Sequence, residues 1–577
     1  MIGARITRRA VPDVGGWPDA MHPVLRRIYA ARGIAVPNDV EHRLAGLLAP
    51  QQLGGIAQAC ELFEAALRSD AHICVVGDFD CDGATGTAVA VRGLRLLGAR
   101  NVSYAVPNRF RHGYGLSPAI VEELLARHPQ LLVTVDNGVA AHAGVAAARA
   151  HGMQVIVTDH HLPGATLPDA DAMVNPNVSG DFFPSKALAG VGVMFYVLLA
   201  LRMHLRERGW FAARAIAEPD LACLLDLVAL GTVADLVPLD RNNRILVEAG
   251  IRRIRGGRAN AGVAALVVAA KRDPARLVAS DLAFGVAPRV NAAGRLEDMQ
   301  LGIECLLCDD VHRAGELAAR LSAINDERRH LQTEMVEQAQ AEVHKWTTQH
   351  GAASIPHGVV LFDPGWHHGV VGLVASKLKE LLHRPVIACA PGEGASGELK
   401  ASGRSIAGFH LRDALAEIDA RCPQLIARFG GHAMAAGLTL QREHLDLFAA
   451  EFDAVARARI APEALESVLF TDGELAPADF CLPLAQQLRD AGPWGQAFPE
   501  PLFDGEFELD SWKIVGETHL RLALRHRDVA QPLMAMAFGA YVGQPPPSRL
   551  RAAYQLDVDE WNGSVRLRLL LRAFEAI

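Results

Sequence analysis

Hydrophobic positions in the first half of the chain form short continuous runs that alternate with longer segments of helical period. The short runs are rich in β-branched residues and predict buried strands, and the segments between them predict helices. Strands that alternate with helices indicate βαβ units and therefore a parallel sheet. The predicted strands are 73–76, 102–106, 131–135 and 154–158, and the predicted helices are 84–97, 118–127 and 140–150.

The pattern changes twice in the second half of the chain. Residues 309–350 are charged and rich in alanine, with no Pro and with no Gly after Gly315, which predicts one long helix. A second α/β pattern begins near His357, and short alternating runs after residue 465 predict a small β-barrel. We therefore expect an α/β protein with a helical lead-in at 1–69, a parallel-sheet domain at 70–307, a connecting helix at 308–350, a smaller α/β domain at 351–460 and a barrel domain at 461–577.

Composition agrees with several globular domains. The chain has 577 residues, 50% hydrophobic and 21% charged, which is too long for one core. No apolar run approaches the roughly 18–20 residues that span a bilayer, and no apolar segment of a signal peptide follows the basic N-terminus. Nine cysteines without a spacing pattern are typical of reduced thiols, and Cys305 and Cys308 lack a second pair at zinc-binding spacing. We expect a cytoplasmic protein with no membrane attachment.

Acidic residues and histidines follow three of the predicted strands, each at the carboxyl end. In open parallel α/β sheets, ligands bind at this edge. Carboxylates so close together repel one another in a folded protein unless cations neutralise them, so the first hypothesis is a divalent-metal site. The residues are Asp78, Asp80 and Asp82 after 73–76, Asp136 after 131–135, and Asp159, His160 and His161 after 154–158.

Asp235, in GTVADLVPL, offers one more carboxylate, although a helix-capping acid explains it equally well from the local pattern. Asp and His ligands without paired Cys suit Mn²⁺ or Mg²⁺ better than structural zinc. They are too many for one ion that also holds substrate, whereas two ions about 3.5–4 Å apart would use them all. Such a pair activates water for in-line attack on phosphorus, so the pattern predicts phosphoester hydrolysis.

Two other interpretations of DFDCDG are weaker. An EF-hand loop needs a bidentate Glu at its twelfth position, but that position, counted from Asp78, is Val89, and a predicted strand rather than a helix precedes the loop. A haloacid-dehalogenase-type phosphatase also uses DxD after its first strand. Such an enzyme would not need the separate Asp-His-His.

Further polar groups stand beside glycine turns. Arg289, Asn291 and Arg295, in PRVNAAGRLED, are candidates for phosphate or backbone contacts. In RFGGHAMAAG, Gly431 and its neighbour let the backbone approach a ligand while His432 donates a hydrogen bond, although a tight turn explains the motif as well.

Aromatic and basic residues recur along the C-terminal region. They would suit an oligonucleotide-binding barrel in which aromatic rings stack on bases and arginines follow the backbone, although aromatic residues in strands are more often core. The residues are Trp494, Trp512 and Trp561, with Lys513, Arg521, Arg525 and Arg527.

Four motifs in this order, DFDCDG, VDNG, TDHH and GTVADLVPL, resemble those of the DHH superfamily of phosphoesterases. VPNRFRHGYGLS, GWHHGVVG, SGRS and FGGHAMAAG narrow the resemblance to the RecJ family of single-strand-specific 5′ to 3′ DNA exonucleases. The resemblance covers the chain from about residue 40 into the terminal barrel. It implies that the two α/β domains are DHH and DHHA1 domains and that the barrel is an oligonucleotide-binding (OB) fold.

The resemblance also implies a role for each matching residue. Asp136 is expected to bridge the two ions and Asp159 to orient the histidines, either of which could instead hold the scissile phosphate. The implied ligands and catalytic groups are Asp78, Asp80, Asp82, Asp136, Asp159, His160, His161 and Asp235. Arg109, Arg111 and Tyr114 are implied near the incoming 5′ end, and His367, His368, Ser402, Arg404, Gly431 and His432 are implied to hold the strand across a cleft between the α/β domains.

We therefore expect a monomeric exonuclease, dependent on two Mn²⁺ or Mg²⁺ ions, that degrades single-stranded DNA processively in recombination and repair. The net charge of −8 argues against a histone-like nucleic-acid binder but permits a local basic groove. A single-strand-binding protein and a RecQ-type helicase are the partners that the family implies. Two alternatives stay open: a hydrolase of oligoribonucleotides, cyclic dinucleotides or pyrophosphate, and a DNA-binding scaffold with a degenerate site.

Overall fold

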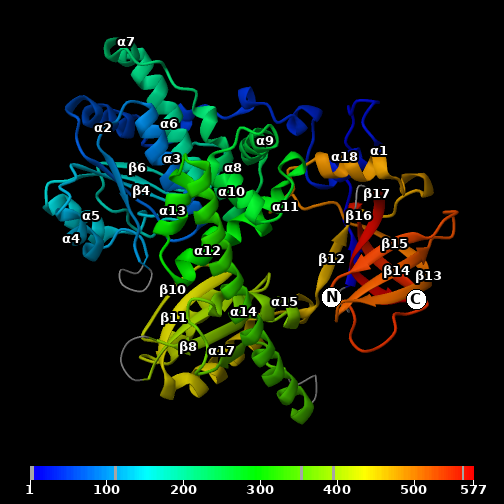
Figure 1. The fold of residues 1–577 in the computed structure, drawn as a ribbon. Helices are drawn as coiled ribbons and strands as arrows, with labels where there is room; N and C mark the ends of the chain where they lie inside the picture. Colours follow the sequence, from blue (N-terminus) through cyan, green and yellow to red (C-terminus); the bar gives the residue numbers. More distant parts are fainter. Residues whose placement is uncertain (1–4, 109–113, 351–354, 393–396, 562–563) are drawn as a thin grey trace. The chain divides into compact units, whose positions relative to one another are not determined.

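The structure is a computed structural model that describes residues 5–108, 114–350, 355–392, 397–561 and 564–577. The chain divides into two compact units (Figure 1). One consists of Val11–Asn325 and Gln487–Glu500, and we call it the parallel-sheet unit. The other consists of the residues up to Ala10 with Asp326–Gln486 and Pro501–Ile577, and we call it the barrel unit.

The parallel-sheet unit is built on five strands. They are β2 (Ile73–Val76), β3 (Val102–Ala105), β4 (Leu131–Val135), β5 (Gln154–Thr158) and β6 (Ala172–Val174). All are parallel, in the order β3-β2-β4-β5-β6. The predicted parallel sheet is therefore confirmed, and the short strand β6 extends it at one edge.

Helices cover both faces of this sheet (Figure 1). They are α2 (Ile56–Ser69), α3 (Cys81–Leu96), α4 (Pro118–Leu125), α5 (His142–Ala150) and α6 (Gly190–Glu207). Helices α4 and α5 bury Ile120 and Val145 against one face, and α3 and α6 pack against each other on the opposite face. Helix α3 begins three residues before its predicted start, because the side chain of Asp80 caps it and accepts the Gly83 N–H at 3.0 Å.

The rest of this unit is helical. Its helices are α1 (Pro23–Ala31), α7 (Trp210–Arg214), α8 (Leu225–Ala234), α9 (Arg241–Arg255), α10 (Ala261–Ala269), α11 (Ala279–Asp281), α12 (Ala287–Leu296) and α13 (Gln300–Leu307). Residues 487–500 join them, because Trp494 stacks on Tyr29 and Phe498 with ring centroids 6.1 and 5.1 Å apart. Trp494 is therefore a core residue of the parallel-sheet unit, and its predicted place on the barrel is wrong.

Helix α14 (Val311–His350) is the predicted long helix. Its 40 residues begin in the parallel-sheet unit and continue into the barrel unit. At 1.5 Å per residue such a helix is about 60 Å long.

The barrel unit contains a mixed sheet that corresponds to the second α/β pattern. Its strands are β7 (Val359–Phe362), β8 (Val386–Pro391), β9 (Glu398–Arg404), β10 (Arg428–Gly431) and β11 (Ala435–Gln441). They lie in the order β10-β11-β9-β8-β7, and only the pair β7 and β8 is parallel. The helices of this part are α15 (Val371–Leu382), α16 (Leu411–Arg421) and α17 (Leu445–Arg459).

A closed barrel follows, as predicted, with the strand order β13-β14-β15-β17-β16. The strands are β13 (Phe503–Val515), β14 (His519–Arg525), β15 (Leu533–Ala537), β16 (Arg549–Trp561) and β17 (Ser564–Ala576), preceded by α18 (Leu482–Asp490). Phe503, Phe507 and Tyr554 are buried among them. Beside the barrel, the unpredicted strand β1 (Arg5–Arg8) pairs in parallel with β12 (Val468–Thr471). In the described part of the chain, no helix combines the length and apolar character needed to cross a membrane.

Candidate metal centre

The strand order of the parallel sheet reverses at β2, which has β3 on one side and β4 on the other. Such a switch point opens a crevice at the carboxyl ends of the strands, where ligands of α/β proteins bind. Asp78 and Asp80 follow β2, Asp136 follows β4, and His160 follows β5. Three neighbouring strands thus bring the predicted residues to one place.

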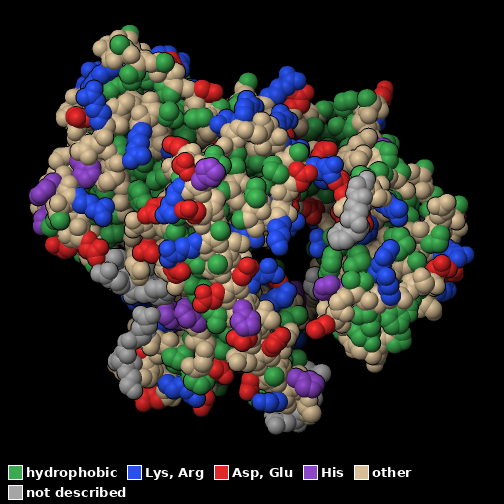
Figure 2. All heavy atoms as spheres, viewed as in Figure 1, with side chains coloured by type: hydrophobic (Ala, Val, Ile, Leu, Met, Phe, Trp, Pro, Cys, Tyr) green, Lys and Arg blue, Asp and Glu red, His purple; other side chains and the backbone are tan. Residues whose placement is uncertain are grey.

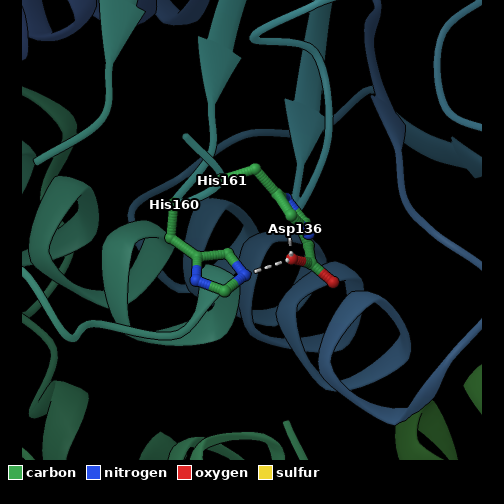
Figure 3. A group of neighbouring side chains, drawn as sticks. All are labelled: Asp136, His160 and His161. Atoms are coloured by element: carbon green, nitrogen blue, oxygen red, sulfur yellow. Dashed lines mark ion pairs between the residues drawn. The ribbon is translucent and has the colours of Figure 1, made fainter. Parts of the chain in front are cut away.

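His160 lies at the centre of this cluster. Its Nε2 is 3.1 Å from Asp136 Oδ1. The Oδ2 atoms of Asp235 and Asp82 lie 3.5 and 3.9 Å from the same nitrogen. Figure 3 shows the imidazole of His160 directed at the Asp136 carboxylate. His161 also approaches this carboxylate, with its Nδ1 4.0 Å from Asp136 Oδ1. Candidate ligand atoms lie within 4.8 Å of one another in three groups: Asp136, His160 and His161; Asp82, His160 and Asp235; and Asp78, Asp80 and Asp136.

The backbone around Asp136 is unusual. Asp136 has φ of 63°, in the left-handed region that residues other than glycine rarely occupy. The start of helix α6 comes so close that a Cβ on Gly190 would lie 2.4 Å from the Asp136 Cβ. Strained backbone of this kind is typical of functional sites, where the surrounding structure holds it in place.

Asp82 is bound by the protein itself. Its Oδ2 accepts the Gly190 N–H at 2.6 Å and its Oδ1 accepts the Val191 N–H at 2.9 Å, both at the N-terminus of α6. Burial and the neighbouring Asp80 nevertheless raise the pKa of Asp82 to about 7. The first N–H groups of α6 therefore bind a carboxylate of the chain at the favourable end of the helix dipole.

Asp159 holds both histidines in place. Its Oδ1 accepts the backbone N–H groups of His160 and His161 and lies 2.8 Å from His161 Nδ1, while its Oδ2 accepts the Val139 N–H. Although burial opposes it, the hydrogen bond and charge of His161 lower the pKa of Asp159. The same contacts outweigh burial at His161 and raise its pKa to about 9. Asp159 thus lies behind the histidines, where carboxylates that orient metal-binding imidazoles are found.

The donor set fits divalent cations. Asp136 Oδ1 and His160 Nε2 are buried and lie 3.1 Å apart, and neither has another hydrogen-bond partner among the residues that the structure describes. Burial and the neighbouring carboxylates raise the pKa values of Asp136 and Asp235. Burial lowers the pKa of His160 to about 4, so this imidazole is neutral at physiological pH. Buried acids beside a neutral imidazole are the ligands that Mn²⁺ or Mg²⁺ would bind.

Asp235 is the last of the clustered carboxylates. It follows the final residue of α8, at the negative end of the helix dipole. A carboxylate there is not a favourable cap, so capping does not explain it. Its Oδ2 lies 3.5 Å from His160 Nε2, so the structure brings it into the same cluster of side chains.

Tyr114 and Asn291, both predicted near the substrate, contact the centre. The Tyr114 hydroxyl donates to the Asp136 carbonyl at 3.0 Å, and its ring meets that of His161 edge-on. Asn291 Oδ1 accepts the Cys81 N–H at 2.8 Å and so fixes the loop before α3.

Of the arginines predicted to contact the substrate in this region, the structure describes two, Arg289 and Arg295. Arg289 donates to the Ala269 carbonyl and the Ser322 hydroxyl, so its observed contacts are internal. Arg295 lies in the last turn of α12. Arg109 and Arg111 lie outside the described residues.

The residues that the family resemblance implies in binding the DNA strand are all in the barrel unit. His367 and His368 stack with ring centroids 5.0 Å apart in the loop before α15. Arg404 donates to the Ser402 hydroxyl at 2.9 Å, and a Cβ on Gly372 would lie 3.0 Å from the side chains of both residues. Gly431, with φ of 140°, is the last residue of β10, and His432 follows it in the turn to β11, the neighbour of β9.

Several residues that shape the metal centre were missed from the sequence. Asn137 donates to the carbonyls of Val76 and Val135 and accepts the Leu116 N–H. The side chains of Asn175 and Asn177 donate to the carbonyls of His161 and His160. Asn137 stands inside the VDNG motif, whereas no local signal marks the other two.

Comparisons with known proteins agree with this geometry. Family models match three parts of the chain: "DHH family, N-terminal domain" at residues 72–232, "DHHA1 domain" at 356–458 and "RecJ OB domain" at 471–573. The single-stranded-DNA-specific exonuclease RecJ of Escherichia coli is 48% identical over 570 residues, 98% of each chain. That of Dickeya dadantii is 51% identical over 557 residues, 96% of each chain. The chain belongs to the RecJ family.

Solved structures of the RecJ family share the fold. The crystal structure of RecJ in complex with Mn²⁺ from Thermus thermophilus has a TM-score of 0.80 and 29% identity, and the match covers 100% of this chain and 80% of that one. The Mg²⁺ complex from the same organism has a TM-score of 0.74 and 28% identity, and covers 100% of this chain and 79% of that one. The arrangement of DHH domain, DHHA1 domain and OB barrel predicted from the motifs is therefore the RecJ fold.

Proposed function

We propose that this chain is an exonuclease specific for single-stranded DNA, which hydrolyses phosphodiester bonds from the 5′ end with two divalent cations in DNA recombination and repair. The observation that carries this proposal is the buried cluster of Asp and His side chains at the switch point of the sheet, which contains every ligand that the family pattern requires. The similarity to RecJ proteins over nearly the whole chain supports single-stranded DNA as the substrate. The 5′ to 3′ polarity follows from the family alone.

We assign the two cations to Asp78, Asp80, Asp82, Asp136, His160, His161 and Asp235. Asp136 and His160 each belong to two of the three ligand groups, and of the two only Asp136 has a carboxylate, which supports it as the bridging ligand. When bound, the cations activate water and neutralise charge on the phosphoryl oxygens. Because His161 Nδ1 pairs with Asp159, a cation or the scissile phosphate would meet His161 through its Nε2, which lies 3.4 Å from the Tyr114 hydroxyl.

We further assign substrate contacts to both units. Arg109, Arg111 and Tyr114 would contact the 5′ end, and Asn291 and Arg295 would support that region. His367, His368, Ser402, Arg404, Gly431 and His432 would hold the sugar-phosphate backbone. Figure 2 shows Lys and Arg side chains mixed with Asp and Glu over the visible face, which supports binding in a local groove.

Digestion of end-labelled DNA tests these assignments. Native protein and the variants Asp136→Ala and Asp169→Asn are given 5′-labelled and 3′-labelled single strands and duplexes during Mn²⁺ titration. Asp136→Ala should lose activity by about 1,000-fold or more while it still binds DNA, because the bridging ligand is gone. Asp169, which is exposed and pairs with Arg149, is the matched control and should leave the rate unchanged.

Two results would contradict the proposal. If Asp136→Ala digests single strands at the native rate, the cluster is not the catalytic centre. If the native protein cleaves dinucleotides but not long single strands, the substrate class is that of the small DHH hydrolases. We also propose that the enzyme is a monomer that acts beside a single-strand-binding protein and a RecQ-type helicase, which reconstituted unwinding and digestion would test.

A further inference from the structure

Residues 185–189, which we call the first loop, lead into helix α6 and reach two groups of the metal centre. The Asp82 carboxylate accepts the first two N–H groups of α6, which come directly after this loop. Inside the loop, the backbone of Leu188 is a hydrogen-bond partner of the His160 side chain. A displacement of the first loop would therefore move the groups that bind Asp82 and His160.

Residues 236–239, which we call the second loop, begin directly after Asp235 and end before Asp240, the N-cap of α9. Leu236 in this loop has φ of 61°, in the left-handed region that residues other than glycine rarely occupy. Strained backbone of this kind persists only where the surrounding structure holds it in place. The position of the Asp235 carboxylate therefore depends on the contacts of the second loop.

Asn243, in the first turn of α9, links the two loops. Its Nδ2 donates to the Ala187 carbonyl of the first loop at 2.6 Å and to the Pro238 carbonyl of the second loop at 2.9 Å. The side chain is fully buried, and its Oδ1 has no hydrogen-bond partner among the residues that the structure describes. Because a buried acceptor without a partner costs free energy, the two bonds that the amide donates are the reason for an Asn at this position.

Asp240 makes a second link between the same parts of the chain. Its Oδ1 caps α9 by accepting the Asn243 N–H at 2.9 Å. Its Oδ2 accepts the hydroxyl of Ser185, the first residue of the first loop, at 2.6 Å. Ser185 is buried, so this bond is made in an environment of low dielectric constant, where it is stronger than in water. The start of α9 therefore fixes the separation of the two loops.

We propose that Asn243 and Asp240 are positioning residues of the nuclease, which act on the metal centre through the two loops. By fixing the loops, they hold Asp82, His160 and Asp235 where these side chains can bind the cations. This inference rests on the function and the ligands proposed above. Groups that orient metal ligands from behind are important for binding, and their loss commonly weakens metal affinity or activity by about 10–100-fold.

Calorimetric titration of the metal-free protein with Mn²⁺, in the absence of DNA, tests the proposal. Asn243→Ala should bind Mn²⁺ about 10–100-fold more weakly than native protein, because both loops lose their shared donor. Asn242→Ala is the matched control, since this neighbouring amide is also buried but accepts the Tyr196 hydroxyl and the Leu48 N–H, outside both loops. Both substitutions should lower the melting temperature in EDTA, but the control should keep the native Mn²⁺ affinity.

Ser185→Ala is a milder variant that keeps the test valid if Asn243→Ala does not fold, because it removes only the bond to Asp240. It should weaken Mn²⁺ binding by about threefold or more, and Ser185→Thr, which keeps the hydroxyl, should bind Mn²⁺ more tightly than Ser185→Ala. On single-stranded DNA, Asn243→Ala should lower kcat at a fixed Mn²⁺ concentration and regain activity as Mn²⁺ increases. The KM for DNA should stay at the native value.

Native Mn²⁺ affinity in the folded variants Asn243→Ala and Ser185→Ala would overturn the proposal. An equal loss of affinity in Asn242→Ala would also overturn it, because the effect would then follow from reduced stability alone. If the native protein degrades DNA while Asn243→Ala binds Mn²⁺ normally, only the positioning role is wrong. If the native protein binds Mn²⁺ but degrades no DNA, the proposed nuclease activity is wrong, so the two failures are distinguishable.

Discussion

At the scale of single residues, the metal centre gathers more carboxylates than the protein groups around it neutralise. Asp82 shows the consequence most directly: although two backbone N–H groups bind it, burial and Asp80 raise its pKa to about 7. Between about pH 4 and pH 7, the metal-free folded protein therefore retains a proton that the unfolded chain releases. The contribution of Asp82 to the stability of the metal-free protein therefore falls as the pH rises through this range.

Calorimetric melting in EDTA and in Mn²⁺ checks this prediction. In EDTA the melting temperature should be lower at pH 7.5 than at pH 5.5, and the increase caused by Mn²⁺ should grow with pH because the cation displaces protons. Asp136→Asn, which removes one buried negative charge, should reduce both effects. A Mn²⁺ effect that shrinks as the pH rises would contradict this view of the centre.

The clustered Asp and His residues could be identified from the sequence, but the hydrogen bonds that other parts of the chain make with them could not. Asp78 and Asp136 could be predicted because each follows an apolar run, and the ends of parallel strands meet at one sheet edge. The contact of Asp82 with the start of α6, more than 100 positions away, could not, because local pattern does not tell which helix N-terminus faces a carboxylate. The same limit explains Trp494, whose aromatic partners include Tyr29.

At the scale of elements, the least predictable strand is β1. It has only four residues, RITR, and such a short alternating run carries little signal. Its pairing with β12 brings Arg8 to Asp504 on β13, at 2.8 Å. The Asp504 side chain is fully buried and also accepts hydrogen bonds from Thr471 and Arg551. Against the effect of burial, these contacts lower the pKa of Asp504. One carboxylate thus ties the N-terminal strand to the barrel.

Asp504→Asn should destabilise the barrel unit by about 2–4 kcal/mol, because Arg8 and Arg551 lose their shared charge partner. Glu474→Gln is the matched control, since Glu474 also contacts Arg8 but is exposed, and it should cost less than about 1 kcal/mol. Urea denaturation followed by tryptophan fluorescence measures both. The pKa of Asp504 is lowered in the folded protein. The loss of unfolding free energy in Asp504→Asn should therefore be complete at pH 7 and should shrink below about pH 4. Equal effects of the two substitutions would refute the central role of Asp504.

At the scale of the whole molecule, the long helix and the closed barrel could be predicted from the sequence. The charged, alanine-rich composition of the helix and the alternating runs of the barrel strands are local patterns. The OB character of the barrel came from the family resemblance. Trp512, 37% exposed and stacked on Tyr541, is compatible with base stacking, whereas the side chain of Trp561 lies outside the described residues. The net charge is −8, and basic and acidic side chains are mixed on the face that Figure 2 shows, so we expect DNA to bind at local basic sites.

Salt dependence tests this distribution of charge. Each phosphate that the protein neutralises releases condensed counterions, so the affinity for a single strand falls with salt at a slope of about −0.7 per contact. A groove that holds about three to five phosphates should lose about 10–100-fold in affinity between 50 and 200 mM salt. The measurement uses Asp136→Asn, which is expected to bind without degrading a labelled oligothymidylate. Affinity that does not change with salt would contradict a basic groove, and a loss far above 100-fold would require contacts with many more phosphates than a local groove holds.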